Sequence, residues 1–242
     1  MQTDNLDQTG QHYMVDKDLI SFIVNESSLR SGDIILEIGF GHGELTKQLI
    51  KKCVVIAVDI DGEFSSNSEN LKLVNANILD VFDDLKFTKI VSNIPYNISE
   101  PLMRKVFRKD IDLCVLTIGK NFADILTKKD NRIGILANNF YDIELLKVVK
   151  PRSFRPMPNT DSAIIRLEPK ELEELDKKAV LYRQLIFLEE KKLKNALEKI
   201  LADKTKRQVN SLTTSPIFKK KIYELSNKEF LELDIALDKV IE

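Results

Sequence analysis

Histidine and cysteine are scarce in this sequence, which has two of each among its 242 residues. Cys53 and Cys114 both lie in apolar runs, so we expect buried free thiols rather than a redox or metal site. His12 and His42 are the only histidines, and no cluster of metal ligands surrounds either of them. The sequence therefore predicts a protein without a bound metal.

A long apolar run and an excess of one charge are also missing. No segment approaches the roughly 20 apolar residues of a membrane span, and the polar, acidic N-terminus does not resemble a signal peptide. We therefore expect a cytoplasmic protein that does not contact a membrane. The formal net charge is -1, so any contact with nucleic acid must come from a local basic patch.

Hydrophobic residues make up 43% of the chain, and through about residue 169 they form short runs that alternate with helix-like periods. Strands that are continuous apolar runs, each followed by a helix, predict a mainly parallel, doubly wound α/β sheet covered on both faces. Asp16 is the expected N-cap of the first helix. We expect strands at 33–38, 53–58, 71–74, 89–91, 112–118, 143–149 and 162–167, and helices at 17–29, 44–51, 101–108, 122–129 and 134–141.

After Pro169 the strand signals stop and the chain becomes charged and helical. Apolar residues at helical spacing predict helices near 179–202, 216–225 and 228–241. The sequence therefore predicts two domains, an α/β domain of residues 1–169 and a small all-α domain of residues 170–242.

The segment Asn93-Ile94-Pro95-Tyr96 follows a predicted buried strand. The Asn93 side-chain carbonyl and the Ile94 backbone carbonyl are two hydrogen-bond acceptors, and Tyr96 offers a flat face for stacking. Two acceptors and a ring suit a planar heterocycle with an exocyclic amine, such as adenine. The alternative is an ordinary turn between a strand and a helix, because Asn and Pro both favour turns.

A second candidate site follows the earlier strands. The loop Gly39-Phe40-Gly41-His42-Gly43 lets backbone N–H groups approach a ligand closely. Asp59, at the end of the next strand, is placed to accept hydrogen bonds from a ribose diol, and Asn77 follows the third strand, where an amide can read an adenine edge. Asp59 as a helix cap and Asn77 as a turn residue are the alternatives. Together with Asn93, these residues predict an N-methyltransferase that uses S-adenosylmethionine.

Four ordered motifs resemble those of the ribosomal RNA adenine N6,N6-dimethyltransferases: 11–16, 36–43, 93–99 and 154–163. The resemblance covers roughly residues 10–170 and implies a Rossmann-like class I methyltransferase fold with a small helical C-terminal domain. It implies dimethylation of two adjacent adenosines near the 3′ end of small-subunit ribosomal RNA during ribosome biogenesis. A sister branch of antibiotic-resistance enzymes, which methylates one adenosine of large-subunit ribosomal RNA, shares these motifs.

The resemblance also assigns roles by position. His12 and Met14 stand where the family contacts the cofactor, and Asn93, Pro95 and Tyr96 stand at its catalytic target-base pocket. Gly39 and Gly41 belong to its glycine loop, Asp59 stands at its ribose acid, and Asn77 stands at its adenine-reading acid. Ile94 would supply the second acceptor for the base.

Other positions depart from the family. Gly119-Lys120-Asn121 replaces a Gln-Lys-Glu stretch, and Leu188-Glu189-Glu190-Lys191-Lys192 replaces a basic run of the tail. These departures bear on RNA affinity and on the choice of target. They keep open a catalytically weakened ribosome-assembly factor of the same fold, as well as the sister activity on the large subunit.

For the substrate we expect ribosomal RNA in the small subunit, bound by a monomer. Phe154 is either a second stacking partner for the base or a core residue that anchors its loop. Three basic groups are candidates for RNA contact, although such runs are usually solvated. They are Arg104, Lys105, Arg108 and Lys109; Lys150, Arg152 and Arg155; and Lys204, Lys206, Arg207 and Lys219 to Lys221.

Overall fold

The computed structural model describes residues 12–61, 64–171, 175–202, 209–210 and 213–241. The chain forms two compact units. One comprises Met1–Asp124 and Asp142–Pro169, and the other comprises Ile125–Tyr141 and Lys170–Glu242. The second unit thus includes a segment that the sequence analysis assigned to the first domain, and the division at residue 169 stays a prediction.

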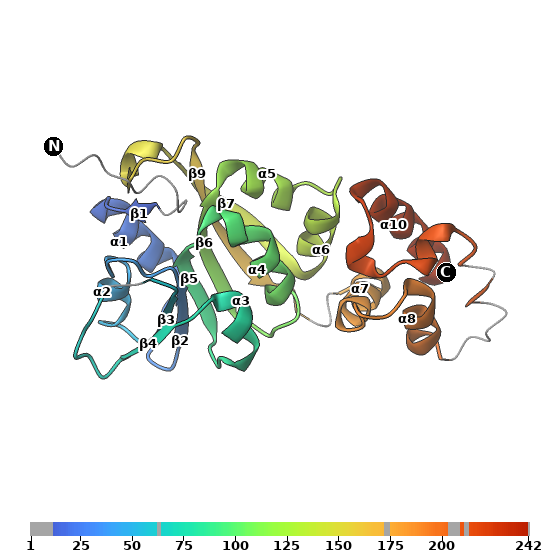
Figure 1. Ribbon diagram of the computed structural model, residues 1–242, viewed down its shortest axis with the longest axis horizontal. Helices are drawn as coiled ribbons and strands as arrows, with labels where there is room; N and C mark the ends of the chain where they lie inside the picture. Colours follow the sequence, from blue (N-terminus) through green and yellow to red (C-terminus); the bar gives the residue numbers. More distant parts are fainter. Residues whose placement is uncertain (1–11, 62–63, 172–174, 203–208, 211–212, 242) are drawn as a thin grey trace. The chain divides into compact units, whose positions relative to one another are not determined.

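A seven-stranded sheet is the centre of the first unit (Figure 1). Its strand order is β4-β3-β2-β5-β6-β9-β7. The neighbours from β4 to β6 are parallel, and β9 is antiparallel to β6. The predicted mainly parallel sheet is therefore confirmed. The strands are β2 (Ile34–Ile38), β3 (Val54–Asp59), β4 (Leu71–Asn75), β5 (Lys89–Asn93), β6 (Leu113–Gly119), β7 (Tyr141–Val149) and β9 (Ser162–Pro169).

Helices cover both faces of this sheet, with α1 and α2 on one side and α3 and α4 on the other (Figure 1). Asp16 caps α1 as expected, because its carboxylate accepts hydrogen bonds from the N–H groups of Asp18 and Leu19. The apolar face of α1 packs on alternate side chains of the central strands, which form a core with it. The helices are α1 (Lys17–Glu26), α2 (Thr46–Leu49), α3 (Ile78–Val81), α4 (Ser99–Val106) and α5 (Lys120–Thr127), with 3-10 turns at Phe82–Asp84, Tyr96–Ile98 and Pro151–Ser153.

A separate two-stranded sheet joins the N-terminal segment to the proline-rich loop. It consists of β1 (Tyr13–Met14) and β8 (Phe154–Arg155), which pair antiparallel. The N–H of Val15 continues the contact by donating to the Ser153 carbonyl at 3.0 Å. Strands of two residues carry no periodicity, so this pairing could not be predicted from the sequence.

The second unit is helical, but its helices differ from the prediction. The helix expected at 179–202 is two helices, α7 (Lys177–Phe187) and α8 (Leu193–Ile200), and the segment 216–225 forms two 3-10 turns, Pro216–Lys219 and Ile222–Glu224. The break occurs because the strand-like residues Lys192 and Lys221 pair, and the N–H of Leu193 donates to the Lys220 carbonyl. Further helices of this unit are α6 (Arg132–Phe140) and α10 (Asn227–Ile241). None of the helices in the described ranges has the length and apolar character that a bilayer span needs.

Candidate functional site

The glycine loop after β2 approaches two other segments so closely that side chains are excluded. A Cβ added to Gly41 would lie 2.3 Å from the Tyr13 ring, and one added to Gly39 would lie 3.3 Å from Pro95. Both glycines have positive φ angles, 75° and 50° for Gly39 and Gly41, which residues with a Cβ rarely adopt. The loop therefore brings its backbone against the turn after β5 and against the N-terminal segment.

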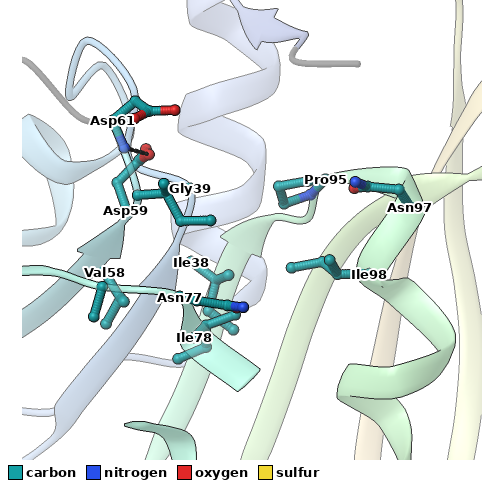
Figure 2. Close-up of a pocket in the computed structure, with 12 residues that line it drawn as sticks. Ile38, Gly39, Val58, Asp59, Asp61, Asn77, Ile78, Pro95, Asn97 and Ile98 are labelled. Carbon is teal, nitrogen blue, oxygen red and sulfur yellow. Dashed lines mark hydrogen bonds between the residues drawn. The ribbon is translucent and has the colours of Figure 1, made fainter. Parts of the chain in front are cut away.

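A cavity of about 270 Å³ lies where the parallel strands end (Figure 2). Parallel α/β sheets bind ligands at this edge, in the crevice beyond the carboxyl ends of their strands. The lining combines apolar side chains with a few polar groups, as small-molecule sites do. It consists of Ile38, Gly39, Val58, Asp59, Ile60, Asp61, Ala76, Asn77, Ile78, Pro95, Asn97 and Ile98.

Asp59 links the end of β3 to the glycine loop. One carboxylate oxygen accepts a hydrogen bond from the N–H of Gly41 at 2.9 Å, and the other accepts one from the N–H of Asp61 at 3.0 Å. These bonds hold the carboxylate in one orientation at the cavity wall. Each carboxylate oxygen has a further lone pair, so Asp59 can still accept hydrogen bonds from a ligand.

Asn77 has a local structural role as well as a place in the cavity wall. Its Oδ1 accepts a hydrogen bond from the N–H of Leu79 at 3.0 Å and so caps α3. The N–H of Leu79 needs an acceptor, so the amide oxygen of Asn77 must face it and the amide nitrogen must point the other way. Figure 2 shows this nitrogen directed into the space bordered by Gly39, Pro95 and Ile98. Asn77 therefore presents a hydrogen-bond donor to the cavity.

A second, smaller cavity of about 40 Å³ adjoins the first. Gly39, Asp59 and Pro95 belong to the walls of both. The structure thus brings most of the predicted site residues to one place. The second cavity is lined by His12, Tyr13, Gly39, Asp59, Asn93, Ile94, Pro95 and Tyr96.

Asn93 is oriented by the N-terminal segment. Its Nδ2 donates a hydrogen bond to the His12 backbone carbonyl at 2.8 Å. A carbonyl can only accept, so the assignment of nitrogen and oxygen in this amide is unambiguous. The Oδ1 atom is buried and has no hydrogen-bond partner among the described residues. Leaving a buried acceptor unpaired costs free energy, so this oxygen is available for a donor on a ligand.

Other buried oxygens at the same edge also lack partners within the described part of the chain. They include Oε2 of Glu37, Oγ of Ser99 and Oγ1 of Thr117, which lie near the carboxyl ends of β2, β5 and β6. Burial raises the pKa of Glu37 to about 8 against the opposing effect of hydrogen bonds from Thr46, and the negative charge of Asp59 acts in the same direction as burial. Buried polar groups without partners are uncommon in folded proteins, and their concentration here makes this edge a candidate binding site.

Two predicted site residues have their side chains elsewhere. Met14 is 7% exposed and packs in the core that α1 forms with the central strands. Phe154 is fully buried in the same core. A ring without an exposed face has no room for a base, so Phe154 in this structure anchors the proline-rich loop. This observation corresponds to the core alternative rather than to the stacking one.

The basic residues proposed for RNA contact are mostly engaged within the protein. Arg104 pairs with Glu100 at 2.6 Å, Lys105 with Asp83, and Lys150 with Asp161 at 2.6 Å. Lys109 donates to the carbonyls of Phe82, Asp83 and Leu85. In the second unit, Lys220 and Lys221 pair with Glu229 and Glu190. Lys204, Lys206 and Arg207 lie outside the described residues.

Two residues near the site were not singled out from the sequence. Tyr13 packs its ring on Gly41, and Ser162 forms a hydrogen bond with the Tyr96 hydroxyl. Ser162 stands in the last of the four motifs, which is a signal that could have found it. Tyr13 stands in the first, but only the tertiary structure reveals that its ring meets the glycine loop.

Comparisons with known proteins identify the family of this chain. A family model described as "Ribosomal RNA adenine dimethylase" matches residues 3–234. A Methanopyrus kandleri protein named "Probable ribosomal RNA small subunit methyltransferase A" is 41% identical over 180 residues, which cover 68% of this chain and 64% of that protein. The match thus spans slightly less than two thirds of that relative's length.

Two solved structures extend the comparison to the fold. A dimethyladenosine transferase from Plasmodium falciparum has a TM-score of 0.66 at 26% identity, covering 94% of this chain and 98% of that one. The 23S rRNA methyltransferase ErmE has a TM-score of 0.61 at 22% identity, covering 93% and 99%, and supports the fold alone. The α/β unit has the Rossmann-like fold of class I methyltransferases. Because the family model matches nearly the whole sequence, this chain belongs to the ribosomal RNA adenine dimethylase family.

Proposed function

We propose that this protein transfers methyl groups from S-adenosylmethionine to the N6 atoms of adenosines in ribosomal RNA. The substrate we propose is the assembling small subunit, in which two adjacent adenosines near the 3′ end of the RNA are dimethylated. We further expect the protein to act as a monomer in the cytoplasm. The family membership supports the reaction, and the two adjoining cavities support the assignment of residues.

The larger cavity fits the nucleoside part of the cofactor. Asp59 offers carboxylate oxygens for a ribose diol, and the amide nitrogen of Asn77 can donate to a ring nitrogen of adenine. Ile60, Ile78 and Ile98 provide apolar surface for the faces of the ring. Gly39 has no side chain, so a ligand can pass close to the backbone between this cavity and the next. When bound there, S-adenosylmethionine would supply an electrophilic methyl group.

The observation that carries the proposal is that Gly39 and the Asn93–Pro95 turn line the same cavity. They approach so closely that a Cβ on Gly39 would lie 3.3 Å from Pro95 and 3.7 Å from the Asn93 backbone oxygen. The glycine loop and Asn93, whose Oδ1 has no partner within the described residues, therefore border a common space rather than two separate ones. A methyl donor against the loop and an amine held by Asn93 would meet there.

Each residue of the turn has a distinct part in the proposed reaction. Adenine N6 is a weak nucleophile because its lone pair is delocalised into the ring. Asn93 Oδ1 and the Ile94 carbonyl would accept hydrogen bonds from the amine and favour a pyramidal nitrogen, whose lone pair can attack. Tyr96 would stack on the base after it leaves its RNA stack. Holding the amine in line supplies most of the rate enhancement, and the proton can leave to water afterwards.

The decisive experiment replaces Asn93 with alanine. We expect Asn93→Ala to lower methyl incorporation into small ribosomal subunits by at least about 10³-fold, because positioning by the amide is lost. Cofactor affinity, measured by calorimetry, should change little. Asn70→Ala is the matched control, since Asn70 is exposed and its side-chain amide donates to the Ile50 carbonyl, away from both cavities.

Mapping the modified nucleotides tests the substrate. Primer extension across small-subunit RNA should stop at two adjacent dimethyladenosines when the wild-type protein is present. A stop in large-subunit RNA instead would assign the sister activity. Cofactor binding without methylation of either RNA would support an assembly factor, and normal activity in Asn93→Ala would refute the proposed site.

A further inference from the structure

Tyr96 is held by a pair of residues on the two strands beside it. Gly119 is the last residue of β6, and Ser162 is the first residue of β9. The antiparallel register places Gly119 directly opposite Ser162. This pair lies next to the turn after β5, because Asn93 pairs with Thr117 on the other edge of β6.

The two residues lie beside different parts of the Tyr96 side chain. The hydroxyl of Tyr96 and Oγ of Ser162 form a hydrogen bond. A Cβ built on Gly119 would lie 3.6 Å from Cγ and Cδ2 of the Tyr96 ring, so the ring lies beside the β6 backbone with space for about one methyl group between them. Ser162 is fully buried, which fixes its hydroxyl in place. The hydrogen bond therefore holds the ring at its hydroxyl end, and the β6 backbone limits the space along one side.

We propose that Ser162 is a positioning residue, which holds the Tyr96 ring in the orientation needed to stack on the target base. The inference rests on the proposed function, since it concerns the same base pocket. Tyr96 begins a short 3-10 turn, and its ring also lies near the His12 ring, with 5.7 Å between the two centroids. The hydrogen bond to Ser162 fixes the direction in which the ring points.

The alternative is that this hydrogen bond only stabilises the fold. The two roles make different predictions for catalysis. A positioning role affects the step in which the base is held for attack, and misplacement by about 1 Å can cost up to roughly 10²-fold in rate. A purely structural role affects the folded fraction and leaves the turnover of folded protein unchanged.

The test compares Ser162→Ala, Tyr96→Phe and the double variant, each as the full chain. Tyr96→Phe keeps the ring and removes the same hydrogen bond. We expect each single variant to lower kcat on small ribosomal subunits about tenfold, with KM for the subunit and cofactor affinity within about twofold. The double variant should be no slower than either single variant, because both changes remove one interaction.

Ser27→Ala is the control for loss of a buried hydroxyl. Ser27 is also fully buried in the first unit, where its Oγ donates to the Ile23 carbonyl at 2.6 Å. Its melting temperature should fall about as much as that of Ser162→Ala, while its kcat should equal that of the wild type. A normal kcat in Ser162→Ala, or effects of Ser162→Ala and Tyr96→Phe that multiply in the double variant, would overturn the inference.

A second measurement does not depend on methyl transfer. The chain has five tyrosines, so fluorotyrosine labelling gives few ¹⁹F signals, and the one missing in Tyr96→Phe identifies Tyr96. We expect Ser162→Ala to shift or broaden this signal, and an unchanged signal would overturn the inference. If the wild type methylates no RNA, the proposed function fails and the positioning role fails with it, whereas the signal still reports whether Ser162 holds the ring.

Discussion

Buried polar groups at one edge of the central sheet have hydrogen-bond partners, whereas several at the opposite edge have none within the described residues. At the amino edge, where β2 and β5 begin, Lys89 is 6% exposed and donates to Asp33 and to the Ser28 carbonyl, both at 2.7 Å. The N–H of Arg30 donates to the same Asp33 oxygen. At the carboxyl edge, oxygens of Glu37, Asn93 and others have no partner within the described residues.

This difference separates stability from function within one sheet. Polar groups at the amino edge satisfy one another, so removing one leaves its partner buried and unpaired. At the carboxyl edge, unpaired groups already cost stability, and a ligand would offset that cost. Groups that stabilise the fold and groups available for binding thus lie at opposite ends of the same strands. Substitutions at Lys89, Glu37 and Asn77 test this division.

The largest effect is expected at the amino edge. Burial alone would raise the pKa of Asp33, but the hydrogen bonds from Lys89 and Arg30 hold it below its usual value. Lys89→Met would leave this carboxylate buried without its cation, which costs about 4 kcal/mol in comparable cases. Urea unfolding at pH 7 measures the loss. Adding Asp33→Leu should recover most of it, and a loss below about 1 kcal/mol would contradict the comparison.

Replacing Glu37 should have the opposite effect to replacing Lys89, because it stabilises the protein. Its pKa is about 8 in the folded protein, above that of an unfolded chain, so the folded state binds more protons between about pH 4.5 and 8. Stability from this group is therefore lost as pH rises through that window. Glu37→Gln abolishes this loss, and its advantage over the wild type should grow from little at pH 5 to on the order of 3 kcal/mol at pH 8.5.

Thermal unfolding of both proteins at several pH values measures this advantage. Asp80→Asn is a suitable control, since Asp80 is an exposed carboxylate on α3. If the stabilities of Glu37→Gln and the wild type changed with pH by the same amount, the buried carboxyl would not be the source of the pH dependence.

The smallest effect concerns Asn77, a carboxyl-edge residue whose oxygen does have a partner. Because Oδ1 caps α3, Asn77→Ala should destabilise the protein by about 1 kcal/mol. Asn77→Asp keeps an oxygen acceptor and should be neutral within about 0.5 kcal/mol. Chemical unfolding of both variants distinguishes the cap from a cavity contact, and equal losses would show that the cap does not contribute.

Local patterns predicted much of this molecule because the interactions involved are close in sequence. The Asp16 cap needs only the N–H groups two and three residues later, and the buried strands need only their own apolar runs. The prediction of a single helix at 179–202 was wrong because the structure there depends on residues distant in the sequence. Its interruption depends on the pairing of Lys192 with Lys221, a partner that no local pattern reveals.

The basic groups illustrate the same limit on the functional side. Lys105 and Lys109 look like RNA ligands in the sequence, yet one pairs with Asp83 and the other binds three carbonyls near it. Phe154 likewise looks like a stacking ring until its burial is known. Residue type indicates what a group can bind, whereas only its neighbours determine whether that capacity is already used.

The amino-acid sequence alone determined the order of the strands in the central sheet, the glycine loop and the Asn93–Tyr96 turn along the chain, because each depends on residues adjacent in the chain. The tertiary structure decided that Gly39 and Pro95 line the same cavities, that the His12 carbonyl orients the Asn93 amide, and that Ser162 holds Tyr96. These contacts join segments up to 81 residues apart. They exist only because strands distant in sequence pair side by side and bring their ends to one edge.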